Sequence, residues 1–314
     1  MDLFITTFES VAVLLGIGIV GFWIIKKRIV PGNILGLLSP LALVIALPSL
    51  IFINIINNFE PSKSTDWWQL PLWWGFFTII SGCLTFIFMF ISQKKTRREF
   101  SASLFYQNGI FFPLAVLTGI FGSESQYVVF LFLFIIFYPA LFFGTYFLFF
   151  KNKDVKSINW KRIIHPVLIF TIIAIIIKLS GTHNYIPYFV SQIFTLLGGM
   201  TVPLIMIILG GNIYLDFQKK GKMQLFEISK FVIIKNLVFP LIFIVILISI
   251  KSIISYPIAI IILLQAAVPP LTAVPLVTER SGGDRAIVNQ FIVASFGLSL
   301  ITIPAMVFLF ESYF

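Results

Sequence analysis

Two apolar stretches of the sequence, NGIFFPLAVLTG (108–119) and AAVPPLTAVPL (266–276), carry prolines beside uncharged polar side chains. Amide and hydroxyl oxygens and exposed backbone carbonyls can coordinate a cation, and the N-terminal end of a broken helix can attract a carboxylate through its partial positive charge. The pattern therefore suits the binding of a small charged solute. The candidate binding residues are Gln107, Asn108, Gly109, Pro113, Gln265, Pro269, Pro270, Thr272 and Pro275.

The prolines of these stretches predict interrupted helices. Proline lacks a backbone N–H and clashes with the preceding turn, which frees carbonyls and leaves half-helix ends inside the protein. In a membrane, such ends are tolerated only where they are buried in protein or line a cavity. Lone prolines such as Pro139, Pro240 and Pro304 are interpreted as structural kinks, because proline is frequent in membrane helices and neighbouring helices repair the damage.

The composition places these stretches in an integral membrane protein. Of the 314 residues, 59% are hydrophobic and 11% are charged, whereas about a quarter of the residues of a soluble protein are charged. The mean hydropathy is +1.04, and no polar block is long enough for a separate soluble domain. The formal charge of +10 does not indicate nucleic-acid binding, because the basic residues lie between apolar segments.

Ten segments come close to the length of about 20 apolar residues that a helix needs to cross the hydrocarbon core. They are residues 5–25, 33–56, 69–92, 101–120, 126–150, 163–180, 187–213, 230–250, 255–277 and 286–310. The two proline-rich stretches fall in the fourth and ninth of these spans. The sequence thus predicts an all-α membrane protein with ten transmembrane helices.

The charges of the loops predict the orientation of the chain. With the N-terminus outside, the inner loops hold all but three of the 22 Lys and Arg residues, the exceptions being Lys63, Lys178 and Lys251. Cytoplasmic loops of membrane proteins carry such an excess of basic residues, and an odd number of spans would spoil the partition. We therefore expect both termini outside. Short loops and the lack of a targeting signal favour a bacterial cytoplasmic membrane.

The two halves of the chain resemble each other. The segment ALPSLIF in the second span is similar to TVPLIMI in the seventh, and Pro48 and Pro203 are separated by nearly as many residues as Pro113 and Pro270. Because each repeat has five spans, the second copy must enter the membrane from the opposite side. The sequence predicts two inverted five-helix repeats, residues 1–150 and 151–314, within a single membrane domain. Secondary transporters are commonly built this way, with the substrate near the midplane between helices broken at corresponding places.

At these residues the sequence resembles the auxin efflux carrier family, which includes many bacterial permeases for small carboxylates. The resemblance runs through LPSLIF, HPVLIFTIIAIIIKLSG (165–181), LGGMTVPLIMIILGGNI (197–213), KNLVFPL (235–241) and AAVPPLTAVPLVTERSGGDRAIVN (266–289), in that order. The sequence departs from the family pattern in the fourth span. There Phe111 and Phe112 precede Pro113, and Asn108 does not align with the family's usual asparagine.

The resemblance implies a fold similar to that of bile acid/sodium symporters, in which the fourth and ninth spans are unwound and cross. Spans one, two, six and seven would form a scaffold, often dimeric, against which the other spans move as a transport unit. In the family, polar residues beside the crossing contact the substrate. That role is carried over to Asn108, Pro113, Gln265, Pro269 and Pro270.

The charged residues suggest neither an enzyme nor a paired-aspartate antiporter. None of the ten spans has an acidic residue near its centre, and burying one there would be costly. Lys178 and Lys235 are placed near span ends, where a long side chain reaches the interface. The motifs HExxH and GxSxG are absent from the sequence, so we expect no catalytic residues, metal or cofactor.

The function predicted from the sequence is a secondary active transporter that moves a small organic anion, in the first place a carboxylate, by alternating access with an elevator-like motion. Its expected partners are that anion, a coupling ion (H⁺ or Na⁺), the lipid bilayer and a second copy of the chain in a homodimer. Two alternatives stay open. One is a sodium-coupled symporter for a substrate like those of bile acid symporters, and the other is a non-transporting sensor or receptor on a transporter fold.

Overall fold

The structure is a computed structural model that describes residues 2–62, 66–150, 166–218 and 223–314. The predicted boundary between the repeats, the first residues of the predicted sixth span and Lys63 lie outside the described residues. The helices of the first half are α1 (Asp2–Lys26), α2 (Ile34–Pro40), η1 (Leu41–Ala46), α3 (Leu47–Asn58), η2 (Trp67–Gln69), α4 (Leu70–Phe88), η3 (Met89–Ile91), α5 (Arg97–Phe105), α6 (Phe111–Phe121), α7 (Gln126–Phe134), α8 (Tyr138–Thr145) and η4 (Tyr146–Phe149). Those of the second half are α10 (Pro166–Leu179), η5 (Thr182–Tyr185), α11 (Tyr188–Gly199), α12 (Thr201–Gln218), α13 (Leu225–Ile233), η6 (Ile234–Val238), α14 (Phe239–Ser249), α15 (Tyr256–Ala267), α16 (Val274–Arg280) and α17 (Arg285–Tyr313).

The protein is all-helical over the described residues and has the apolar helices of a multi-pass membrane protein. Seven of its described helical segments are long and apolar enough to cross a membrane: Leu3–Lys26, Ile34–Asn58, Trp67–Ile91, Gln126–Phe149, Tyr188–Leu215, Leu225–Ser249 and Arg285–Tyr313. Three further predicted spans contain shorter apolar helices, Phe111–Phe121, Pro166–Leu179 and Tyr256–Ala267. Seven spans are therefore supported by length, while the ten-helix inverted repeat stays a prediction.

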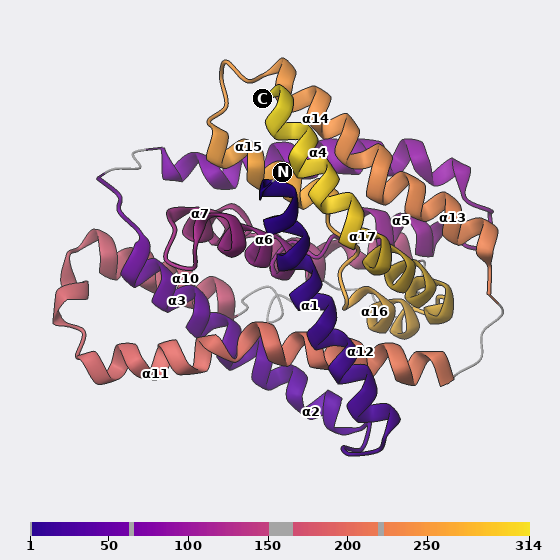
Figure 1. Ribbon diagram of the computed structural model, residues 1–314, viewed down its shortest axis with the longest axis horizontal. Helices are drawn as coiled ribbons and strands as arrows, with labels where there is room; N and C mark the ends of the chain where they lie inside the picture. The colour runs from indigo at the N-terminus through magenta and orange to yellow at the C-terminus, as the bar shows by residue number, and fades with distance from the viewer. Residues whose placement is uncertain (1, 63–65, 151–165, 219–222) are drawn as a thin grey trace.

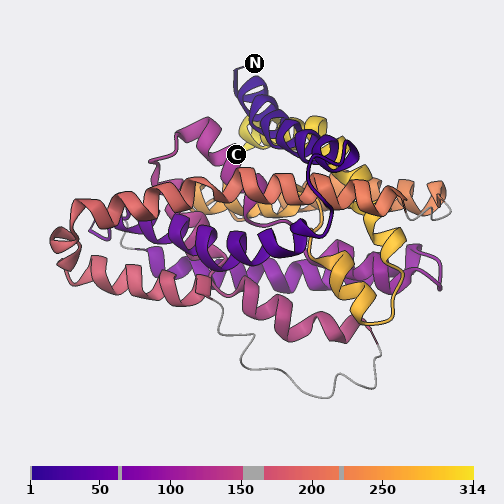
Figure 2. The ribbon, with the colours of Figure 1, turned by 90° about the horizontal axis from the view of Figure 1, so that it is seen from below.

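The helices pack in two groups. In the first group, α3 lies against α10 and α11, and α12 lies against α1, α2 and η1; Figure 2 shows α2 and α3 between α10 and the long α11–α12 pair. In the second group, α15 contacts α4, α14 and α17, and α17 also contacts α5, α13 and α16. The groups meet where α1 packs against α6 and α17 and where α3 packs against α7. In Figure 1 the first group occupies the lower part of the view, with α10 and α11 at the left and α2 at the bottom.

Small residues let α1 and α12 approach closely. A Cβ at Gly210 would overlap the carbonyl oxygen of Gly18, and one at Gly21 would overlap the backbone of Ile207. Contacts of this kind are typical of membrane helices, whose association depends on close backbone packing because lipid tails are as apolar as the side chains. The α1–α12 pair is thus a tightly fitted contact within the first group.

Pro48 and the lone prolines of the sequence occupy different places in their helices. Pro48 and Pro240 follow the π-helical turns η1 and η6, which is how a helix absorbs a missing N–H without ending. Pro304 lies inside the continuous helix α17. Pro139, by contrast, stands in the first turn of α8, where its missing N–H has no partner in any case. It therefore begins a helix and does not kink one.

Candidate functional site

The predicted fourth and ninth spans are both interrupted. Residues 106–110, here called the first break, separate α5 from α6, and residues 268–273, the second break, separate α15 from α16. The last helical bond before the second break runs from the Val268 N–H to the Leu264 carbonyl, at 3.1 Å. The next two donors would belong to Pro269 and Pro270, which have no N–H. The carbonyls of Gln265 and Ala266 therefore lose their helical partners.

Pro113 and Pro275 have a different place from the one predicted. Both lie in the first turn of a helix, Pro113 in α6 and Pro275 in α16. The N–H groups of a first turn have no partner within the helix, so proline costs nothing there. The prediction that Pro113 breaks the fourth span is wrong in this detail, because the break precedes it.

The two breaks bind each other. Gln107 and Pro270 form an antiparallel bridge. The Asn108 N–H donates to the Pro269 carbonyl at 2.8 Å, and the Leu271 N–H donates to the Tyr106 carbonyl, also at 2.8 Å. Backbone groups that neither helix can satisfy are thus satisfied by the other break, as burial in an apolar protein requires.

Side chains complete the contact between the breaks. Gln265 is fully buried, and its Nε2 donates to the Gly109 carbonyl at 2.7 Å. Gln107 Nε2 lies 3.4 Å from Gln265 Oε1, and the Tyr138 hydroxyl donates to the Gln107 carbonyl at 2.5 Å. A Cβ at Gly109 would overlap Gln265 Oε1, so only glycine lets the amide come this close. Gln107, Gly109 and Gln265 therefore hold the breaks together.

The prediction that Lys235 lies near the end of a span is wrong. It lies in the π-helical turn η6, inside the apolar segment Leu225–Ser249, and its side chain is 1% exposed. Its Nζ is 3.4 Å from the Ala266 carbonyl, one of the two that Pro269 and Pro270 leave free, and 5.3 Å from the centre of the Phe239 ring. A cation is favoured at the carboxyl end of a helix. The sequence signal that could have found it is KNLVFPL, where a lysine stands inside an apolar run.

The buried side chain of Asn108, in the first break, has an amide without hydrogen bonds within the described residues. The residue has no exposed surface, and neither Oδ1 nor Nδ2 has a hydrogen-bond partner within the described residues. It stands as many residues before Pro113 as Gln265 stands before Pro270, yet only the glutamine reaches the opposite break. Since most buried polar atoms are bonded, an unsatisfied amide at such a place indicates a role beyond packing.

A cavity of about 380 Å³ lies beside the breaks, between the two groups of helices. The first group contributes Ser39 and Asn212, and the second contributes Ile110, Thr272 and Asn289. Of the predicted site residues, Thr272 and Pro275 line this cavity. The others, Gln107, Asn108, Gly109, Pro113, Gln265, Pro269 and Pro270, are buried. The predicted site is thus split into a cavity wall and a buried support behind it.

The cavity has polar groups that the sequence analysis missed. Asn212 lies in the motif LGGNI (209–213), and Asn289 and Arg285 lie on α17 just after the SGGD turn. Asn289 Nδ2 has no partner within the described residues, whereas Arg285 is paired with Glu279. Ile110 and Phe111 bring the N-terminus of α6 to the cavity, with the partial positive charge and free N–H groups of a helix start.

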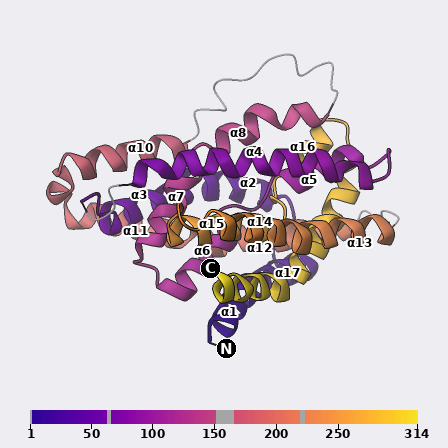
Figure 3. The ribbon, with the colours of Figure 1, turned by 90° about the horizontal axis from the view of Figure 1, so that it is seen from above.

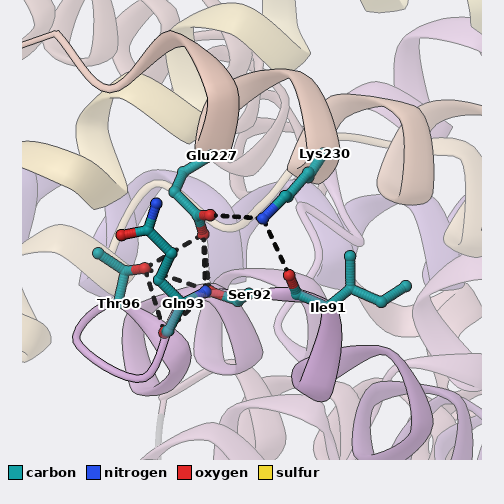
Figure 4. Close-up of polar contacts among 6 residues, drawn as sticks. All are labelled: Ile91, Ser92, Gln93, Thr96, Glu227 and Lys230. Carbon is teal, nitrogen blue, oxygen red and sulfur yellow. Dashed lines mark hydrogen bonds and ion pairs between the residues drawn. The ribbon is translucent and has the colours of Figure 1, made fainter.

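A second polar cluster links α13 to the turn between α4 and α5 (Figure 4). Glu227 is 1% exposed and accepts from Ser92 Oγ at 2.9 Å and from the Gln93 N–H and Thr96 Oγ1 at 3.2 Å each. Its other oxygen lies 2.9 Å from Lys230 Nζ. A buried carboxylate with this many donors is well satisfied. The cluster fixes α13, and through it Lys235, relative to α4 and α5.

Broken helices that satisfy each other beside a cavity, in an apolar bundle, are typical of membrane transporters. The chain belongs to the membrane transport protein family. The sequence model of this family matches residues 6–158 and 153–307. It is also similar to an uncharacterized transporter (MJ1031) of Methanocaldococcus jannaschii, with 31% identity over 183 residues. That match covers 55% of this chain and 58% of the relative, so the chain spans less than two thirds of the relative's length.

Proposed function

We propose that the protein is a secondary active transporter of a small organic anion such as a carboxylate, and that the cavity beside the two breaks is its binding site. The observation that carries this proposal is the position of the cavity. Its wall combines the second break, through Leu271, Thr272 and Ala273, with residues of the other helix group, through Ser39 and Asn212. Secondary transporters hold their substrates at such broken helices.

The electrostatics of the cavity favour an anion. None of the described residues that line it is Asp or Glu, and Arg285 is among them. The N-terminus of α6 adds partial positive charge, and Asn289 and Asn212 offer amide donors. A mono- or dicarboxylate fits this chemistry and the volume of about 380 Å³.

The breaks give the substrate site a support that can move as one body. Asn108, Gln265 and Lys235 connect the first break, the second break and η6, all within the second group. Alternating access then follows if this group moves against α1, α2–α3, α10 and α11–α12 in an elevator-like motion, the first group acting as a scaffold in a homodimer. A ten-helix inverted repeat with crossed fourth and ninth spans is the arrangement that this proposal uses.

Coupling to H⁺ or Na⁺ is part of the same proposal. The unsatisfied amide of Asn108 lies at the breaks, and amide oxygens and backbone carbonyls can bind Na⁺. If the coupling ion is Na⁺, the alternative function, a sodium-coupled symporter for a substrate like those of bile acid symporters, differs from the first only in its substrate.

Transport into proteoliposomes tests the proposal. The purified protein is reconstituted and offered labelled mono- and dicarboxylates under an imposed Na⁺, proton or voltage gradient. We expect saturable uptake of at least one carboxylate above empty vesicles, with the solute delivered chemically intact. If binding is seen by thermal shift but no gradient drives uptake or exchange, the protein is a sensor or receptor and the carrier proposal fails.

A further inference from the structure

A second cavity, of about 570 Å³, lies between α4, α5 and the α8–η4 segment. Figure 3 shows these three elements next to one another on one side of the molecule. One end of the cavity is lined by Lys94, Arg97 and Arg98, and the rest is mainly apolar. It is referred to below as the α4–α5–α8 groove.

The length of the groove matches one leaflet of a bilayer. Along α4 and η3 it extends from Gly82 past Phe86 and Met89 toward the turn that carries Lys94. At about 1.5 Å per residue, the helical part from Gly82 to Ile91 is roughly 14 Å long. Half of a hydrocarbon core of about 30 Å is nearly the same length.

The apolar part of the groove opens to the surface where lipid tails would lie. Phe86 is 64% exposed and Leu148 is 70% exposed, and both line the groove. In a membrane-spanning bundle, exposed apolar side chains such as these face the acyl chains. A long apolar ligand could therefore enter sideways from the bilayer.

Within the described residues, neither Glu99 nor Glu227 is paired with the cations of the groove. Glu99 is turned away, because its Oε1 accepts from the Asp284 N–H at 2.9 Å. Glu227 is occupied by Lys230 and the 92–96 turn. Arg97 is half-buried, lies 5.1 Å from the centre of the Phe90 ring, and has no partner for its Nε within the described residues. Guanidinium groups bind phosphate oxygens in a bidentate manner.

We propose that the α4–α5–α8 groove binds one anionic phospholipid of the adjoining leaflet. The phosphate would lie against Arg97, Arg98 and Lys94, and an acyl chain would lie along Phe86 and Leu148 toward Gly82. Three cations above an apolar slot of leaflet length complement this ligand in both charge and shape. The proposal does not depend on the transported substrate, so it can stand or fall independently of the proposed function.

Native mass spectrometry of the full-length protein in detergent tests the proposal. The protein is titrated with phosphatidylglycerol, with phosphatidylcholine of the same acyl chains, and with glycerol phosphate, an anionic phosphate ester without acyl chains. We expect tight binding of phosphatidylglycerol only. Neutralising two cations in R97Q/R98Q should lower its affinity about 25-fold, since each cation near an anionic headgroup contributes roughly fivefold.

Two further variants make the result specific. K26Q/K27Q removes two exposed charges at the end of α1 and should leave phosphatidylglycerol binding unchanged. Gly82→Leu keeps every charge but places a side chain in the slot, where a Cβ meets only Phe105, at 3.6 Å, so it should also weaken lipid binding. Equal affinity of R97Q/R98Q and the unaltered protein would overturn the proposal. So would equal binding of phosphatidylcholine, or of glycerol phosphate, which would make the groove a site for small anions.

Discussion

At the scale of single residues, the two amides at the breaks have different tasks. Gln265 Nε2 bonds to the Gly109 carbonyl at 2.7 Å, whereas the Asn108 amide has no partner within the described residues. The first therefore stabilises the fold, whereas the second keeps unused hydrogen-bonding capacity behind the cavity wall. This division gives a prediction that separates binding from stability.

We expect Asn108→Ala to lower the affinity for a transported carboxylate or its coupling ion about tenfold or more, since a hydrogen bond to a charged group is worth about 1.5–3 kcal/mol. The free energy of unfolding should hardly change. Gln265→Ala should instead reduce it by about 1–3 kcal/mol, because the Gly109 carbonyl loses its donor. Denaturant titration in detergent and a ligand titration measure both quantities. Unchanged affinity in Asn108→Ala would move the site away from this amide.

Gly109 provides a steric test of the same contact. An alanine Cβ there would overlap Gln265 Oε1, so Gly109→Ala should destabilise the protein by about 1–3 kcal/mol, the usual cost of overpacking. At Gly75 in α4, an added Cβ would meet no atom within 4 Å. The matched variant Gly75→Ala should be neutral or stabilising by about 0.5–1 kcal/mol, because alanine is the better helix former. Equal effects of the two variants on the unfolding midpoint would contradict the steric explanation.

At the scale of elements, the end of α15 is set by two missing donors. Pro269 and Pro270 cannot bond to the Gln265 and Ala266 carbonyls, and Lys235 supplies a substitute for one of them. Lys235 therefore bonds to the Ala266 carbonyl, which is free because Pro270 has no N–H. Its burial does not fit an interfacial side chain.

We expect Pro269→Ala/Pro270→Ala to lengthen α15, since both lost helical bonds can then form. The bridge between Gln107 and Pro270 would be weakened, and carboxylate uptake would fall at least about tenfold. The N–H groups that the variant gains at residues 269 and 270 would be protected from hydrogen exchange, because they are bonded in the lengthened helix. Pro304→Ala, within the continuous helix α17, serves as the control and should retain uptake. If the double variant transports normally, the second break is not needed for function.

At the scale of the whole molecule, the cavity beside the breaks lies between two groups of helices, which also meet where α1 packs against α6 and α17 and where α3 packs against α7. Ser39 and Asn289 line the cavity and belong to different groups. Phe22 and Phe217, whose ring centres are 6.5 Å apart, both belong to the first group and lie outside the cavity lining. If the second group moves, the distance between Ser39 and Asn289 changes, whereas the distance within the other pair stays the same. Cross-linking can therefore detect the motion.

The only cysteine is Cys83, so Cys83→Ser gives a background free of other thiols. In it, a flexible bis-maleimide across Ser39→Cys/Asn289→Cys should abolish carboxylate uptake, and a thiol-cleavable linker should restore it on reduction. The same reagent across Phe22→Cys/Phe217→Cys should leave uptake intact. Full transport with the first pair cross-linked would rule out movement between the groups and with it the elevator-like mechanism.

The sequence by itself determined the membrane character, the places of the apolar helices and the neighbourhood of both breaks, because hydropathy and the missing N–H of proline act locally. Only the tertiary structure decided which atoms meet. Asn108 and Gln265 look alike in the sequence, and packing alone leaves one unsatisfied and bonds the other. Lys235 could not be placed from its neighbours in the chain, since its partner, the Ala266 carbonyl, is on another helix. The same holds for the cavity, whose walls come from segments distant in sequence and exist only once the two groups are packed together.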